Sequence, residues 1–147
     1  MIEDAFFRLI IQATILFFVA YTTGNLVYYK DIKVNYTRKI NHFALFSIPF
    51  LLDNFFPVEA SLESLLLGSF LAVSGLIIYI KPIRDNSSII SRMFLSFDRP
   101  EDRPNTLLWL STQLIVGYLI LIPIIIYFYK IGYETLILLP ILVNGIG

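Results

Sequence analysis

A loop near the middle of the chain, Asp98–Pro104 with the sequence DRPEDRP, combines five charges and two prolines in seven residues. Carboxylates are ligands that Mg²⁺ prefers, and arginine binds phosphate through its planar fork. The two prolines would limit the entropy lost when such a loop becomes ordered. We therefore interpret the loop as a candidate site for a metal–polyphosphate complex. The candidate Mg²⁺ ligands are the acids Asp98, Glu101 and Asp102, and the candidate phosphate ligands are Arg99 and Arg103.

The alternative interpretation of this loop is structural. Its opposite charges would pair with one another in water, and Asn105 would cap the helix that follows. Composition alone favours this alternative, because runs of exposed charge are usually solvated surfaces.

A second group with possible chemistry is the sequence TRKINHF, Thr37–Phe43. Arg38 and Lys39 are candidate phosphate ligands, and His42, one helical turn further on, is a candidate catalytic base or phosphate donor. The alternative is that Arg38 and Lys39 anchor a membrane helix on the cytoplasmic side and that His42 is a hydrogen-bonded polar residue near the interface. His42 is the more suggestive of the three, since polar residues within spans tend to be functional.

The third group is NGIG at the carboxyl end, where Asn144, Gly145 and Gly147 are candidate cofactor-binding residues. Glycines let backbone amides approach a phosphate closely. The alternative is a frayed terminus. The last apolar segment, from Ile131, is barely long enough to cross a bilayer, so we expect this chain to be the first part of a longer protein.

The composition indicates the environment in which these groups lie. The chain has 147 residues, 57% hydrophobic and 15% charged, with mean hydropathy +0.76. Soluble domains have about 45–50% apolar and about 25% charged residues, so we predict an all-α polytopic membrane protein. A net charge of zero argues against a nucleic-acid partner, and a chain with no cysteine and one histidine lacks the usual ligands of a zinc site.

We predict four to five membrane-spanning helices, because a span needs about 20 mostly apolar residues. Residues 1–147 would form one transmembrane domain without an internal linker. Gly68 and Gly75 would allow close helix packing, and Gln12 and Gln113 would pair between helices. The predicted spans are Leu9–Tyr29, Ile40–Phe56, Ser64–Ile80, Thr106–Tyr129 and a fifth from Ile131 to Gly147.

The basic residues predict the orientation. Nine of the eleven lie in the two loops 30–39 and 81–103, so these loops are expected in the cytoplasm and the amino terminus outside. Between Asn86 and Phe97, apolar residues recur at helical spacing, which predicts a short amphipathic helix in the membrane interface. It would hold DRPEDRP close to the lipid headgroups. The three candidate groups would then meet at one membrane surface.

Taken together, these groups resemble the dolichol, phytol and polyprenol kinase family, which is related to phosphatidate cytidylyltransferases. RKINH at Arg38–His42 is similar to the R-K-x-x-H of that family. The stretch from Asp98 to Gln113 looks like one found in some bacterial members, and NGIG looks like the approach to the family's glycine–aspartate motif. That motif and the helices after it are absent from this sequence.

The resemblance implies a membrane-bound enzyme that transfers phosphate from a nucleoside triphosphate, CTP or ATP, with Mg²⁺, to an isoprenoid alcohol in the membrane. Its partners would be this lipid and the nucleotide, together with a missing carboxyl-terminal part or further copies of the chain. Two alternatives stay open: an enzyme like phosphatidate cytidylyltransferase, and a non-catalytic helical scaffold or subunit.

Overall fold

The computed structural model describes residues 2–56 and 62–132, and the regular elements in these ranges are all helical. The all-α prediction is therefore confirmed for this part of the chain. The elements, in order, are α1 (Ile2–Lys30), α2 (Val34–Asp53), α3 (Leu62–Gly75), the 3₁₀ helix η1 (Leu76–Tyr79), α4 (Lys81–Asn86), α5 (Ser88–Leu95), the 3₁₀ helix η2 (Pro100–Asp102) and α6 (Thr106–Lys130).

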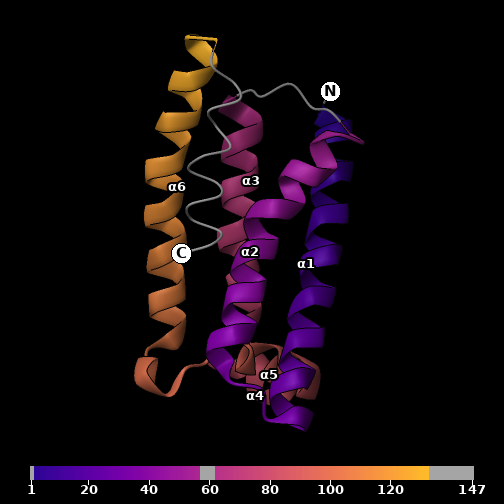
Figure 1. The fold of residues 1–147 in the computed structure, drawn as a ribbon, viewed down its shortest axis with the longest axis vertical. Coiled ribbons are helices and arrows are strands. Elements are labelled where there is room, and N and C mark those ends of the chain that lie inside the picture. The colour runs from indigo at the N-terminus through magenta and orange to yellow at the C-terminus, as the bar shows by residue number, and fades with distance from the viewer. Residues whose placement is uncertain (1, 57–61, 133–147) are drawn as a thin grey trace.

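The four long helices α1, α2, α3 and α6 run along the long axis of the molecule, and the short helices α4 and α5 lie across one end (Figure 1). Both basic loops, 30–39 and 81–103, lie at this end, which we call the polar end. At the opposite end, Arg8 Nη2 of α1 donates a hydrogen bond of 2.7 Å to the carbonyl of Pro49 in α2. Contacts at both ends therefore hold α1 and α2 as an antiparallel pair.

The loop between α1 and α2 is short. Asp31 has a φ of 51°, in the left-handed region that Asp tolerates better than most residues. This conformation reverses the chain within three residues and places the start of α2 beside the end of α1. The first turn of α2, with Thr37 and Arg38, thereby lies at the polar end.

The hydrophobic core of the polar end forms where α5 crosses α1. Met93 and Phe94 of α5 are buried against Ala20 of α1 and Tyr79 of η1. The predicted amphipathic helix therefore exists as α5, capped by Ser87, whose side chain accepts a hydrogen bond from the amide of Ile90. The sequence placed the apolar side chains of this helix in the membrane interface, but Met93 and Phe94 pack inside the protein.

A seam of buried polar side chains joins α1, α2 and α5. Asn41 Nδ2 donates to Thr23 Oγ1 at 2.9 Å, and Thr37 Oγ1 donates to the carbonyl of Ser96 at 3.0 Å. Within the described ranges, every buried side-chain nitrogen or oxygen has a hydrogen-bond partner. Because an unpaired polar group in an apolar interior is costly, these pairs fix the relative positions of the three helices.

One helix in the described ranges is long and apolar enough to cross a membrane, Phe6–Lys30 in α1, with a mean hydropathy of 1.6. The four to five spans predicted from the sequence are therefore not found in this part of the chain. In α6 a shorter apolar stretch, Thr106–Gly117, is described, and α3 has 14 residues. Signal sequences and buried core helices also have this length and composition, so α1 gives only weak support for a membrane protein. A core helix fits less well, because only 11% of the apolar window is buried.

Candidate functional site

The two charged groups singled out in the sequence meet at the polar end. Arg38, in the first turns of α2, donates from Nη1 to Asp102 Oδ2 of η2 at a distance of 2.7 Å. These residues are 64 positions apart in the chain. Their side chains are 17% and 11% exposed, so the pair is largely shielded from solvent. The predicted convergence of the two groups is therefore observed.

Arg99 binds the same carboxylate from within the loop. Its Nε donates to Asp102 Oδ2 at 2.9 Å and its Nη2 to Asp102 Oδ1 at 3.0 Å, a bidentate pair between residues i and i+3. The hydrogen bonds from Arg99, and then the one from Arg38, hold the pKa of Asp102 below its ordinary value of 3.8, although desolvation opposes them. The same hydrogen bond raises the pKa of Arg99. Asp102 is therefore an anion shared by two guanidinium groups.

A third element completes this site. Arg38 Nη2 donates to Gln113 Oε1 of α6 at 2.7 Å. Gln113 thus pairs with Arg38 and not, as the sequence suggested, with Gln12. We refer to Arg38, Arg99, Asp102 and Gln113 as the Arg38 cluster. Three elements, α2, η2 and α6, contribute to it, so the orientation of the Arg38 guanidinium depends on all three.

The remaining charges of the loop form a separate pair. Asp98 Oδ2 accepts from Arg103 Nε at 2.8 Å, and Asp98 Oδ1 accepts from Thr106 Oγ1 at 2.6 Å. Thr106 is buried at the first turn of α6, so this pair ties the loop to the start of that helix. The structural alternative, in which opposite charges of the loop pair with one another, therefore describes Asp98 and Arg103 well.

The acids of the loop are the candidate ligands of a metal ion. In the part of the chain that the structure describes, there is no group of three or more His, Cys, Asp or Glu side chains placed to hold a metal ion. Asp98 and Asp102 are instead paired with arginines, and Glu101 is exposed. The assignment of Asp98, Glu101 and Asp102 as Mg²⁺ ligands therefore stays a prediction from the sequence.

The other predicted site residues lie at varying distances from the cluster. Lys39 follows Arg38 on α2 and is exposed, and His42 lies one helical turn beyond Arg38 and is also exposed. Both remain predictions. Asn144, Gly145 and Gly147 lie outside the described residues, so the third group is not placed.

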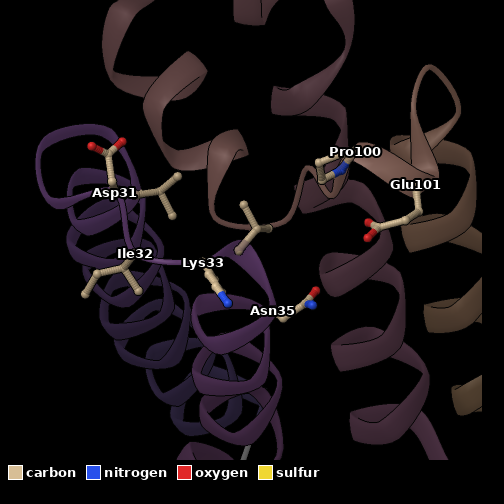
Figure 2. A pocket seen from close by; sticks show the side chains of 8 residues that line it. Asp31, Ile32, Lys33, Asn35, Pro100 and Glu101 are labelled. Carbon is tan, nitrogen blue, oxygen red and sulfur yellow. The ribbon is translucent and has the colours of Figure 1, made fainter.

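An open pocket of about 330 Å³ lies between the α1–α2 connection and η2 (Figure 2). Lys33 and Asn35, at the start of α2, line one side of it, and Pro100 and Glu101 of η2 line the other. Asn35 precedes Arg38 by three residues, so the two share a face of α2, and Glu101 is adjacent to Asp102. A ligand that occupies this pocket would therefore lie next to the Arg38 cluster.

Several residues that position the site were not found by sequence reasoning. Thr37 is completely buried and Asn41 is 7% exposed, although both stand inside the TRKINHF stretch. The sequence did contain a signal for their burial: Thr37 and Asn41 are polar and four positions apart, the spacing at which residues share one face of a helix. The contact of Gln113 with Arg38 had no such signal, because it joins residues 75 positions apart.

Comparisons with known proteins give no further identification. No family model matches the chain. No curated protein and no solved structure matches it either. The family resemblance drawn from RKINH, DRPEDRP and NGIG therefore stays a hypothesis.

Proposed function

We propose that this chain forms part of a membrane-bound lipid-alcohol kinase, which transfers phosphate from a nucleoside triphosphate, CTP or ATP, to an isoprenoid alcohol. The observation that carries the proposal is the 2.7 Å contact between Arg38 and Asp102. It joins the two stretches, RKINH and DRPEDRP, on which the family resemblance was based. A resemblance in two separate stretches gains weight when the folded chain brings them to one place.

The chemistry of phosphoryl transfer fits this kind of site. The alcohol oxygen forms a bond to the terminal phosphorus, the bond from that phosphorus to the nucleoside diphosphate breaks, and the alcohol proton passes to a base. The protein mainly has to position the groups and balance the charge on the phosphate oxygens. Arg38 and Arg99 would bind these oxygens, with Lys39 and Arg103 nearby, and His42 is our proposed base. This step uses only groups of the described chain and the two substrates.

The proposal requires a membrane, and the surface of the molecule supports it. Soluble monomers rarely expose large contiguous apolar patches. Here α1, α2 and α6 each expose several large apolar side chains along their length, and α3 exposes Phe70. Examples are Phe7 and Phe18 of α1, Phe43 and Leu51 of α2, Phe70 of α3, and Leu108 and Leu119 of α6. We propose that α1, α2, α3 and α6 cross the bilayer with the polar end in the cytoplasm.

The arrangement across the membrane can be tested by cysteine accessibility, because the sequence contains no cysteine. We expect Lys33→Cys and Glu101→Cys to react with a membrane-impermeant maleimide from the cytoplasmic side of sealed vesicles. Phe55→Cys, at the other end of α2, should react only from the opposite side, since 20 helical residues span about 30 Å. Reaction of all three cysteines from the same side would show that α2 does not cross the bilayer.

Product analysis tests the reaction itself. Membranes carrying the protein should convert labelled CTP or ATP and a polyprenol into a lipid phosphate and a nucleoside diphosphate. With phosphatidate as acceptor, a CDP-lipid and pyrophosphate would instead identify a cytidylyltransferase. Membranes with inactive protein would be the control for host enzymes. No turnover of nucleotide with either acceptor would contradict both enzyme proposals and favour the scaffold.

A further inference from the structure

The two arginines of the Arg38 cluster hold Asp102 in different ways. Arg99 makes two parallel hydrogen bonds to it within the loop, between residues i and i+3. Arg38 makes one, from Nη1, and this bond runs between α2 and η2. A single bond between elements opens more readily than a bidentate pair within one short loop. The weaker connection in the cluster is therefore the one between Arg38 and Asp102.

Asp102 has the chemistry of an internal competitor for phosphate. Carboxylate and phosphate oxygens bind the same guanidinium donors with the same planar geometry. Arg38 would keep its second contact, from Nη2 to Gln113, if the first were exchanged. The Arg38 side chain is 17% exposed, so a part of it can be reached from solvent. The open pocket lined by Lys33, Asn35 and Glu101 is formed by residues close to Arg38 and Asp102 in the sequence.

We infer that Arg38 is an exchangeable ligand of a phosphate subsite: an incoming phosphate oxyanion replaces Asp102 on Arg38 Nη1, while the Arg99–Asp102 pair and the Gln113 contact remain. Asp102 thus keeps Arg38 neutralised and ordered while the site is empty, and it lowers the affinity for phosphate, because an incoming oxyanion has to displace it from Arg38 Nη1. This inference rests on the proposed function, because it specifies how that function's phosphate site is filled.

The test is the affinity of the purified protein in detergent micelles for inorganic pyrophosphate, measured by calorimetry. Asp102→Asn removes the competing negative charge and keeps the size of the side chain. We expect it to bind pyrophosphate about tenfold more tightly than the wild type, in line with the loss of one charge-assisted hydrogen bond to a competitor. Arg38→Ala should lose most of the binding.

A matched control separates local exchange from overall charge. Asp85→Asn makes the same change in net charge at the polar end, where Asp85 pairs with Arg84 at 3.4 Å and is 54% exposed. We expect its pyrophosphate affinity to stay within about twofold of the wild type, because exposed pairs contribute little. An equal gain in both variants would overturn the exchange and indicate a general electrostatic effect.

Results that contradict the exchange can be told apart from results that also contradict the phosphate site. Weaker binding by Asp102→Asn would show that Asp102 positions the arginines and does not compete, and the phosphate site of the proposed function would survive. Unchanged binding by Arg38→Ala, or no binding by the wild type, would contradict both the exchange and that phosphate site.

If Asp102→Asn fails to fold, ¹⁵N spectra of the six arginines in the wild type replace it. Pyrophosphate should then shift the Arg38 resonances and leave Arg99 Nε near its original position, and a shift of Arg99 Nε alone would overturn the exchange.

Discussion

Gly24→Ala should strongly destabilise the polar end, although it adds a single methyl group. A Cβ at Gly24 would collide with the backbone of α5: it would contact the carbonyl oxygen of Arg92, lie 2.7 Å from the carbonyl carbon of Arg92 and 2.9 Å from Met93 Cα. Backbone atoms of a packed helix cannot rotate away as a side chain can, so α5 has to move as a whole. Overpacking that forces backbone shifts typically costs about 1–3 kcal/mol, and we expect the upper end of this range here.

The displacement would spread because several contacts depend on the position of α5. Met93 and Phe94 would separate from Ala20 and Tyr79, and the buried hydrogen bond from Thr37 to the Ser96 carbonyl would lengthen. We expect the midpoint of unfolding in an SDS titration to fall clearly, with helicity followed by circular dichroism.

Gly117→Ala is the matched control. In the part of the chain that the structure describes, nothing lies within 4 Å of a Cβ at Gly117, in the interior of α6. Alanine there should be neutral or stabilise the helix by up to about 1 kcal/mol, because glycine is the poorer helix former. Equal midpoints for the two variants would show that α5 does not pack against α1 at Gly24.

The sequence and the structure agree best where the pattern is local. Long uncharged stretches between charged loops predict helices, and α1, α2 and α6 cover the central parts of the expected segments. Contacts between helices were harder to predict. Gly68 and Gly75 were expected at close contacts, yet among the described residues a Cβ at Gly68 meets only Leu9 Cδ2, at 3.8 Å, and one at Gly75 meets nothing within 4 Å. The close contact is at Gly24, because the crossing angle and position of α5 are properties of the tertiary fold.

The candidate site was also predictable only in part, because its residue types are a local property of the sequence and its contacts are not. Residue types identified Arg38 and the charged loop as groups that could bind phosphate, and the orientation of the basic loops placed both at one end. Their partners could not be read from the sequence. The sequence suggested a metal as the partner of Asp102, and the structure shows two arginines bound to it, at 2.7–3.0 Å. Arg38 and Gln113 come close to Asp102 only in the folded chain, so the sequence could not show that Arg38 is a partner of Asp102.

Arg38→Ala is expected to have the largest effect on activity. Arg38 is the single residue that contacts both η2 and α6 in the cluster, through Asp102 and Gln113. In the proposed kinase, its loss would remove a fixed cationic donor from the site where charge builds up on the transferred phosphate. Removing one such preorganised donor lowers the rate by about 10²–10³-fold in other enzymes. We expect a decrease of this size in the formation of lipid phosphate by membranes carrying the variant.

Two further variants show whether the loss is specific to Arg38. Arg38→Lys keeps the charge but lacks the planar fork of the guanidinium group. A lysine cannot contact Asp102 and Gln113 at once as Arg38 does, nor bind a phosphate through two parallel hydrogen bonds, so this variant should restore only a small part of the rate. Lys130→Ala removes a cation from the end of α6 far from the polar end and should leave the rate unchanged. The helicity of Arg38→Ala should match the wild type, since the buried Thr37–Ser96 and Asn41–Thr23 bonds do not involve Arg38. Wild-type turnover by Arg38→Ala would mean that the Arg38 cluster only supports the fold, and the reaction would then have to be sought elsewhere in the protein.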